Sequence, residues 1–189
     1  ELRKFYAGSE RRQLKMGHRV SHKNEKFIHA ATPGNLQIDL TFYRKNKLPV
    51  FGAVDVFSRW AYYERVPNKE AKSVIVSIKN AIREFEKVSK HRVSNLASDA
   101  GSEFIHKDTK TWLTKSHIHY DQQARSRKLI ESLNRTLRRY VERIGWDTIK
   151  ELDKLIEDFV MDYNNTKHSS TNKTPNELVS IEKKKEVKA

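Results

Sequence analysis

The chain has 189 residues, and its 38 Lys and Arg residues against 24 Asp and Glu residues give a formal net charge of +14. This length fits one domain with a sizeable core. The charge favours a polyanionic partner, nucleic acid above all, although a lysine-rich surface that keeps the protein soluble is the alternative. The absence of cysteine excludes disulfides and thiolate zinc sites, and no apolar run approaches the roughly 18 residues of a membrane span.

Residues 1–34 are polar and basic without a lasting hydrophobic period, and we interpret them as a lead-in or linker. Three histidines lie there, at His18, His22 and His29. Without cysteines or an ordered spacing, they read as surface histidines rather than a zinc site. Because the sequence starts with Glu instead of Met, we expect it to be part of a longer protein.

From residue 35 onward the chain becomes rich in β-branched and aromatic residues, in the runs "LQIDLTFY", "LPVFGAVDVFSRW" and "AYYERVP". These runs predict three successive strands. Apolar residues at helical spacing between 68 and 90 predict an amphipathic helix. The run "HRVSNLAS" then predicts a strand that leads into Asp99, and a short helix and a brief strand, "HIHY", follow it.

The last third is predicted to be helical. An apolar stripe from Ile130 to Ile144 is followed by Gly145, a residue typical of the position after a helix end. Thr148 with Glu151 forms a capping-box pattern for the next helix, and Pro175 marks the first turn of a last short helix. The charged tail, 181–189, is predicted to be disordered. This order of elements predicts an α/β fold, a mixed sheet covered by helices on both faces.

Three acidic residues are candidates for a metal site. Asp39 lies inside the first predicted strand, where a buried carboxylate needs a partner or a cation. Asp99 ends the later strand, in "LASDAGSEF", where capping of the next turn is the simpler alternative. If the two strands are neighbours, these aspartates face each other. Glu131 lies beside the apolar stripe of a helix, and an ion pair with Arg135 is its simpler interpretation.

Five blocks of this sequence resemble the catalytic core of retroviral-type integrases, the Asp-Asp-Glu recombinases. The blocks are "QIDLTFY", "VDVFSRWAYYERV", "SDAGSEF", "KLIESLNRTLRRY" and "YNNTKHSSTNKTPNEL". They span about 36–179 in family order and are most similar to the integrases of retrotransposons, Maverick or Polinton elements and virophages. One block alone is weak evidence, but five in order are specific. The domain expected from them covers 35–180.

This resemblance implies a ribonuclease-H-like fold with a five-stranded mixed sheet. It carries the metal-binding and catalytic triad over to Asp39, Asp99 and Glu131, with two Mg²⁺ or Mn²⁺ ions bound when DNA is present. The implied activity is 3′-end processing and strand transfer of element or viral DNA, by a homodimer or a larger multimer, in a host nucleus or a virion or element particle. The DNA contacts expected are Lys128, Asn134, Arg135, Arg138, Gln122 and Gln123.

One departure from the family pattern concerns spacing. Only 31 residues separate Asp99 from Glu131, fewer than the family commonly has, and the usual interval would end at Arg135, which cannot bind a cation. The shortfall falls in "YDQQARSRK", where the family has a flexible loop. Either the loop is naturally short or the sequence lacks residues there; a truly short loop puts strand-transfer geometry in question.

Other interpretations stay open. The same fold supports a nuclease that cuts without joining, and the basic composition alone would suffice for a DNA-binding or assembly module without catalysis. Asp55 reads as a structural partner of a nearby basic group, with a direct catalytic role as the lesser alternative. Trp60 and Trp112 read as core or dimer-interface aromatics.

Overall fold

The computed structural model describes residues 30–43, 48–99, 101, 104, 106–121 and 128–180. In chain order its elements are β1 (Asn35–Tyr43), β2 (Leu48–Asp55), β3 (Ala61–Arg65), α3 (Ala71–Ser89), β4 (Asn95–Ala97), α4 (Lys107–Lys115), β5 (His119–Asp121), α5 (Lys128–Ile144), α6 (Ile149–Asn165) and α7 (Pro175–Val179). This is the predicted order of strands and helices. The predicted lead-in lies outside the described residues except for 30–34, and the predicted tail, 181–189, lies outside them entirely.

The strands form one mixed sheet in the order β3-β2-β1-β4-β5, which confirms the predicted α/β architecture. The strand β2 pairs antiparallel with both β1 and β3, whereas β4 pairs parallel with β1 and β5 pairs parallel with β4. The strand β4 is shorter than the run that predicted it. The segment that leads into β4 passes close to Gly34, just before β1. At Gly34 φ is +107° and an added Cβ would lie 2.5 Å from the carbonyl oxygen of Arg92, so this close approach requires glycine.

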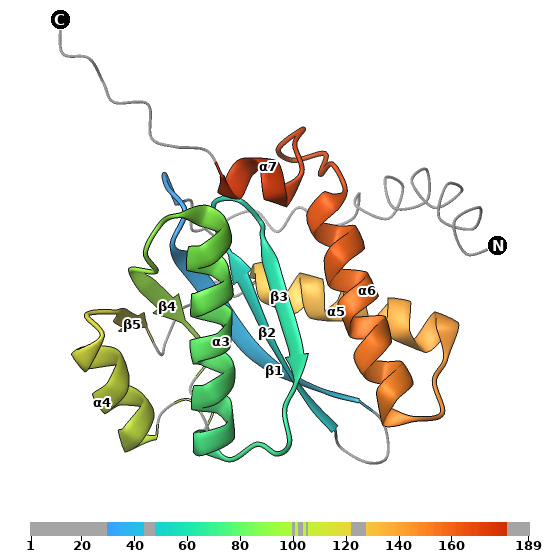
Figure 1. Cartoon of the computed structure of the whole chain (residues 1–189), viewed down its shortest axis with the longest axis horizontal. Coiled ribbons are helices and arrows are strands. Elements are labelled where there is room, and N and C mark those ends of the chain that lie inside the picture. The colour runs from blue at the N-terminus through green and yellow to red at the C-terminus, as the bar shows by residue number, and fades with distance from the viewer. Residues whose placement is uncertain are drawn as a thin grey trace, which may run out of the picture.

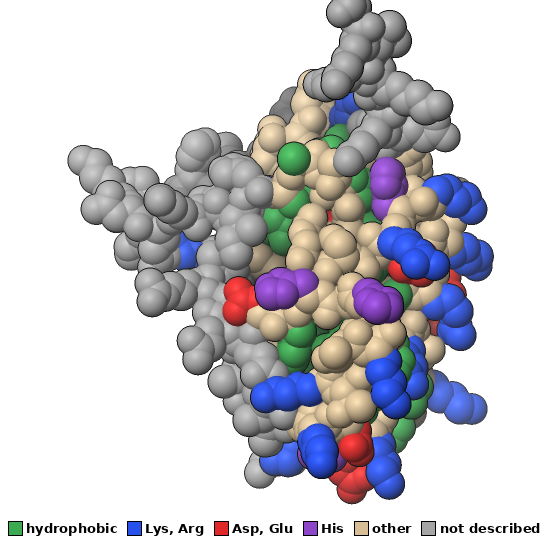
Figure 2. Space-filling view, turned by 90° about the vertical axis from the view of Figure 1, so that its left-hand side faces the viewer, with side chains coloured by type: hydrophobic (Ala, Val, Ile, Leu, Met, Phe, Trp, Pro, Cys, Tyr) green, Lys and Arg blue, Asp and Glu red, His purple; other side chains and the backbone are tan. Residues whose placement is uncertain are grey.

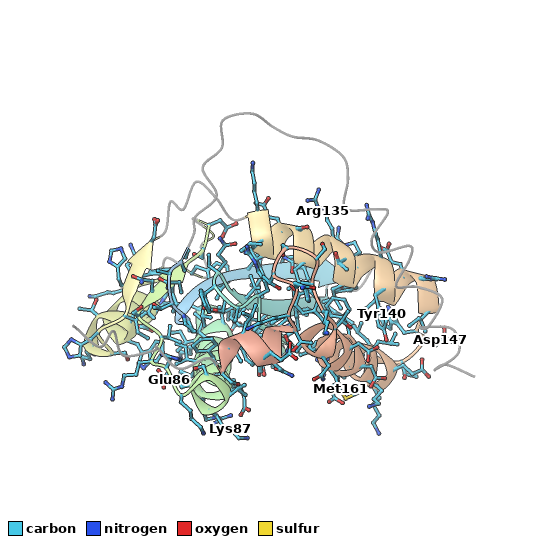
Figure 3. All side chains as sticks on the ribbon, turned by 90° about the horizontal axis from the view of Figure 1, so that it is seen from above. Glu86, Lys87, Arg135, Tyr140, Asp147 and Met161 are labelled. Carbon is cyan, nitrogen blue, oxygen red and sulfur yellow. The ribbon has the colours of Figure 1, made fainter. Side chains whose placement is uncertain are left out.

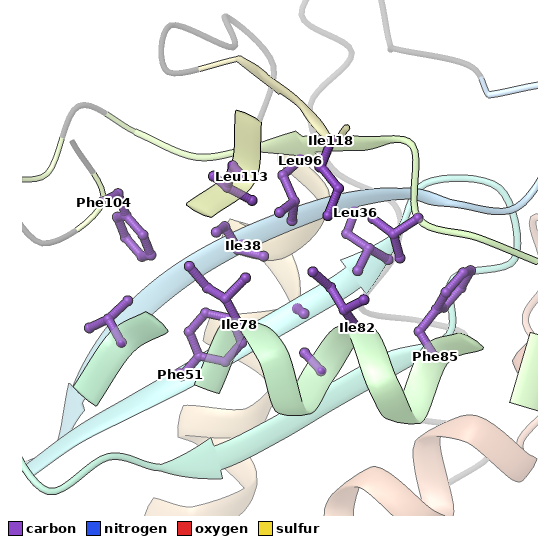
Figure 4. Packing of buried hydrophobic residues seen from close by; sticks show 14 of the residues in the cluster. Leu36, Ile38, Phe51, Ile78, Ile82, Phe85, Leu96, Phe104, Leu113 and Ile118 are labelled. Carbon is purple, nitrogen blue, oxygen red and sulfur yellow. The ribbon is translucent and has the colours of Figure 1, made fainter. Parts of the chain in front are cut away.

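One face of the sheet packs against α3 and α4 (Figure 1). Alternate residues of β1 point to this side, as a strand with a side-chain period of two requires. The buried stripe of α3 has the spacing of one helix face and consists of Val74, Ser77, Ile78, Ala81, Ile82, Phe85 and Ser89. Figure 4 shows this core, in which Leu36 and Ile38 of β1 meet Ile78 and Ile82 of α3.

The opposite face of the sheet packs against α5, and α6 lies along the edge strand β3 and against α5 (Figure 3). Ile130, Leu133, Leu137 and Val141 form the buried stripe of α5, as predicted, while Ile144 at its end is exposed. The predicted capping box of α6 is present, because Thr148 and Glu151 bond each other's backbone N–H groups. None of the helices among the described residues has the length and apolarity that crossing a membrane requires.

Asn164 on α6 closes the outer edge of β3. Its Oδ1 accepts from the backbone N–H of Ala61 (2.9 Å), and its Nδ2 donates to the carbonyl oxygen of Ala61 (2.8 Å). At the other end of the strand, Arg65 pairs with Asp153 through two hydrogen bonds. The backbone groups of Ala61, which an edge strand would otherwise leave to water or to another chain, therefore have partners from α6, and a side-chain ion pair ties the other end of β3 to the same helix.

Candidate active site

The helix α5 lies alongside β1 and is held to it by a regular series of hydrogen bonds. They run from the Ile130 N–H to Gln37 Oε1 (3.3 Å), from Asn134 Nδ2 to Asp39 Oδ2 (2.8 Å) and from Arg138 Nη2 to Thr41 Oγ1 (2.9 Å). Two strand residues advance about 6.7 Å and four helix residues about 6 Å, so the two elements stay in step. This match fixes the position of the first turn of α5 relative to β1.

Two of the predicted acids share one pocket beside this contact. It has a volume of about 270 Å³ and is lined by Asp39, Leu40, Thr41, Phe42, Glu131, Asn134, Arg135 and Arg138. One water occupies about 30 Å³ in the liquid, so the pocket has room for hydrated ions or a phosphate group. Asp39 is half-buried on its floor, and Glu131 is exposed on α5. The structure therefore brings a strand carboxylate and a helix carboxylate to one cavity.

Asp99 lies at the end of the strand next to Asp39. The parallel register pairs Asn35 with Asn95 and Gln37 with Ala97, the last residue of β4. Asp39 lies two residues beyond Gln37 on β1, and Asp99 lies two residues beyond the end of β4. Its Oδ1 accepts a hydrogen bond from the Gly101 N–H (3.0 Å), which is the turn-capping arrangement considered above as the simpler alternative.

Within the described part of the chain, no three His, Cys, Asp or Glu side chains come close enough to hold a metal ion. The structure thus joins Asp39 and Glu131 at one pocket and leaves the Asp99 carboxylate directed at its own turn. Their donor set nevertheless fits a hard divalent cation, because carboxylate oxygens are the ligands that Mg²⁺ and Mn²⁺ prefer.

The residues expected to contact DNA lie in different surroundings. Arg135 is exposed and projects from α5 away from the sheet (Figure 3). Arg138 lines the pocket and donates to Thr41, while Lys128 begins α5. Asn134 is only 8% exposed, and its amide bonds protein groups. Gln122 and Gln123 lie outside the described residues.

Asp55 is fully buried and has a structural environment. Its two carboxylate oxygens accept hydrogen bonds from the N–H groups of Gly34, Asn35 and Ser58 and from the Ser58 hydroxyl. Burial raises the pKa of this carboxyl, and the hydrogen bonds from Ser58, Gly34 and Asn35 oppose that shift. Its hydrogen bonds come from backbone N–H groups and a hydroxyl. The expected basic group is Arg59: burial lowers the pKa of its guanidinium, and the charge of Asp55 opposes that shift.

Two residues of this region were missed in the sequence. Tyr63 donates a hydrogen bond to Asn134 (2.8 Å), and Gly52 lies between Tyr63 and Asp39 in the sheet. A glycine in the middle of a strand often marks a close approach of another group. That signal was available in "LPVFGAVD", but it does not say which group approaches.

Surface charge differs around the molecule. Figure 2 views the side of α4 and β5 and shows histidine and Lys or Arg side chains spread over a mostly neutral surface, with few carboxylates. The pocket at Asp39 instead combines two carboxylates with two arginines. Such a mixture suits an anionic substrate held by arginine beside a cation held by acids.

Solved structures of retroviral integrases have a similar fold. The catalytic core domain of HTLV-2 integrase, solved in complex with magnesium, matches with a TM-score of 0.66 at 18% identity, over 79% of this chain and 99% of that one. The core domain of BIV integrase matches with a TM-score of 0.63 at 18% identity, over 77% and 93%. A simian T-cell lymphotropic virus intasome, in complex with PP2A regulatory subunit B56 gamma, gives 0.75 at 15%, over 90% of this chain and 63% of that one.

At such low identity these likenesses show the fold alone, the ribonuclease-H-like fold of integrase cores. No curated protein sequence matches the chain significantly. The family model described as "Integrase core domain" matches residues 29–128, more than half of the chain. That match includes Asp39 and Asp99 and ends before Glu131, and the branch of the family nearest to this chain stays a prediction. The chain belongs to the integrase core domain family.

Proposed function

We propose that this chain is the catalytic core of an integrase, a polynucleotidyl transferase that trims the 3′ ends of element or viral DNA and joins them to target DNA. The observation that carries the proposal is the shared pocket of Asp39 and Glu131, with Asp99 at the end of the adjacent strand. Family membership supports the reaction class. The pocket supplies a place where a strand acid, Asp39, and a helix acid, Glu131, can act on one phosphodiester.

We propose that Asp39, Asp99 and Glu131 would hold the divalent metal. Bound Mg²⁺ or Mn²⁺ would supply activation of the attacking oxygen and stabilisation of the leaving oxygen. Asp39 suits this role because the Leu40 N–H (3.0 Å) and Asn134 Nδ2 hold its two oxygens in place. Glu131 lies in the first turn of α5, where the positive end of the helix dipole favours an anion.

The cationic residues near the pocket would position DNA. We propose that Arg135, Arg138 and Lys128 bind phosphates, which fixes the DNA without reading much sequence. Asn134 also lines the pocket, and its Nδ2 donates a hydrogen bond to Asp39. We propose that it contacts DNA as well as holding this carboxylate. Gln122 and Gln123 are proposed as further contacts from the segment that precedes α5.

Both reactions use the same site and differ in the nucleophile. Water would attack a phosphodiester near the end of the strand, which releases the terminal piece and leaves a 3′ hydroxyl. That hydroxyl would then attack a phosphodiester of target DNA, whose own 3′ oxygen leaves. We propose that the working assembly is a homodimer or a larger multimer, and that it acts in a host nucleus or within a virion or element particle. The assemblies in the related intasome and core structures are those of the related proteins. For this chain, DNA and further copies of itself are the partners that we propose.

The decisive assay combines pre-trimmed DNA ends, a target plasmid and Mg²⁺ or Mn²⁺. We expect joined product with the natural chain and none with Asp39→Asn or Glu131→Gln, while folding and DNA binding survive. Matched controls are Asp108→Asn on α4 and Glu157→Gln on α6, both exposed and outside the pocket. These controls should join DNA as the natural chain does.

Each alternative predicts a different pattern in this assay. Metal-dependent cutting without joined product indicates the nuclease. Activity that is unchanged in Asp39→Asn, or DNA binding with no cutting at all in any assembly state, indicates a non-catalytic module. Loss in Asp39→Asn but not in Glu131→Gln would remove the helical glutamate from the proposed triad and leave the strand acids.

A further inference from the structure

A single row of residues crosses three strands beneath the pocket. Gly52 on β2 pairs with Asp39 on β1 and, on its other side, with Tyr63 on β3. Paired residues on neighbouring strands project to the same face of a sheet, here the face covered by α5. Tyr63 and Asp39 are therefore separated by the width of one strand, and the residue between them has no side chain.

The glycine is what lets the tyrosine ring cross β2. A Cβ at position 52 would lie 2.4 Å from Cε1, 2.9 Å from Cζ and 3.0 Å from Cδ1 of Tyr63. Any residue other than glycine would displace the ring, because contacts that short do not occur. The far side of the ring packs edge-on against Phe159 of α6, with 6.2 Å between centroids. The ring is thus fixed, and its hydroxyl reaches toward β1.

Asn134 connects this hydroxyl to Asp39. The Tyr63 hydroxyl donates to Asn134 Oδ1 (2.8 Å), and Asn134 Nδ2 donates to Asp39 Oδ2 (2.8 Å). An ionised carboxylate only accepts hydrogen bonds, so the amide must present its NH₂ group to Asp39. The amide oxygen then faces Tyr63, and a hydroxyl that donates to it fixes that orientation against the reversed one.

We propose that Tyr63 is a positioning residue for Asp39, which acts through Asn134 and depends on the space left by Gly52. This inference rests on the proposed function, because it concerns the acid assigned there to the metal. The Tyr63 hydroxyl holds the amide of Asn134 in place, and that amide holds one carboxylate oxygen of Asp39. Removal of a group that bonds a metal ligand directly, as Asn134 bonds Asp39, typically lowers metal affinity about 10- to 100-fold, and Tyr63 lies one step further out.

The test replaces Tyr63 by phenylalanine, which keeps the ring over Gly52 and removes only the hydroxyl. Mg²⁺ alone is titrated into the ¹⁵N-labelled chain, and NMR follows two reporters beside Asp39, the Leu40 backbone N–H and the Asn134 side-chain NH₂. Because Tyr63 acts one step beyond the direct partner, we expect Tyr63→Phe to raise the apparent Mg²⁺ dissociation constant by the lower part of that range, about 10-fold. The Asn134 NH₂ resonances should also shift before any metal is added.

The neighbouring residue gives a matched control. The Tyr62 hydroxyl donates to Glu64 Oε2 (2.6 Å), and its ring packs with the α3 side of the sheet. Tyr62→Phe therefore also removes a phenol hydrogen bond on β3, but not one that leads to Asp39. It should leave the Mg²⁺ titration unchanged.

A double variant tests the route of the effect. In an Asn134→Ala background, Tyr63→Phe should change the Mg²⁺ dissociation constant little, since the connection to Asp39 is already cut. An equal effect of Tyr63→Phe with and without Asn134 overturns the proposal. Unchanged Mg²⁺ binding in Tyr63→Phe, or the same loss in Tyr62→Phe, also overturns it.

Asp39→Asn separates this inference from the proposed function. Loss of Mg²⁺ binding in Asp39→Asn, together with normal binding in Tyr63→Phe, refutes the role of Tyr63 and leaves the metal site standing. Normal Mg²⁺ binding in Asp39→Asn refutes the assignment of the ligand and, with it, the positioning role.

Discussion

Replacement of Asn164 by alanine should weaken the attachment of α6 to the sheet. The side chain is 6% exposed and supplies both the donor and the acceptor for Ala61. A buried backbone group left without a partner costs about 1–3 kcal/mol. Two such groups would cost about 2–6 kcal/mol, and because β3 is an edge strand that water can reach, we expect the lower part, about 2–4 kcal/mol.

Urea unfolding followed by circular dichroism measures this loss directly. For a protein of this size, about 1 kcal/mol corresponds to roughly 2–4 °C, so the midpoint of thermal unfolding should fall by about 5–15 °C. The control is Asn165→Ala, because Asn165 is exposed and, among the described residues, its amide bonds Met161 and Asn176 at the surface. A loss below about 0.5 kcal/mol, the usual range for surface changes, or one equal to that of Asn165→Ala, would refute the argument.

Three further results are expected. Burial lowers the pKa of His168 below its ordinary value of 6.5, so the unfolded chain binds the proton more readily and stability should fall as the pH drops below about 6.5. His168→Gln should therefore reduce the change in the urea midpoint between pH 7.5 and pH 5.5. The same substitution at exposed His119 should leave that change as it is. Arg135→Ala should reduce the slope of log K for DNA against log salt by about 0.9 per lost phosphate contact, whereas Arg83→Ala on α3 should leave it unchanged. Asp55→Asn should destabilise the fold by about 2–4 kcal/mol in urea unfolding without lowering the DNA-joining activity of the folded fraction, and a specific loss of activity would contradict its structural role.

Hydrophobic period predicted most of this fold. Strand alternation placed Ile38 and Leu40 on one face and Asp39 on the other, and the stripe of α5 was predicted from its spacing. The alternation of strands and helices predicted a mixed sheet covered on both faces, but not the order of the strands within it, which the structure defines. The ends of strands were harder to predict. The strand β4 covers only Asn95–Ala97, where it pairs with β1 and β5, and the longer apolar run in the sequence does not show where that pairing stops.

Contacts between distant polar residues could not be predicted in the same way. Asn164 and Asn134 each pair with a residue far away in the chain, and a single asparagine has no period that identifies its partner. A glycine within a strand indicated that some group approaches closely at Gly52. The sequence did not identify Tyr63 as that group, because an aromatic residue in a strand is ordinary. Polar networks of this kind depend on the final packing of helix against sheet, which only the three-dimensional structure defines.

The unusual spacing between Asp99 and Glu131 bears on which helix residue faces Asp39. Sequence counting by the family interval led to Arg135, one turn beyond Glu131. The position of α5 does not depend on that count, because its buried stripe and its hydrogen bonds to Gln37, Asp39 and Thr41 fix it on β1. A shift by one turn would move Asn134 away from Asp39 and break the whole series.

A change of loop length before α5 should therefore leave the helix in place. Insertion of four small polar residues, Gly-Ser-Gly-Ser, after position 124 should preserve the Asn134 to Asp39 contact, seen as an unchanged Asn134 NH₂ resonance by NMR. It should also leave Mg²⁺ binding dependent on Glu131, so that Glu131→Gln weakens it in the lengthened chain as in the original. Dependence that moved from Glu131 to another residue would show that the loop, and not the packing of α5 on β1, selects the acid.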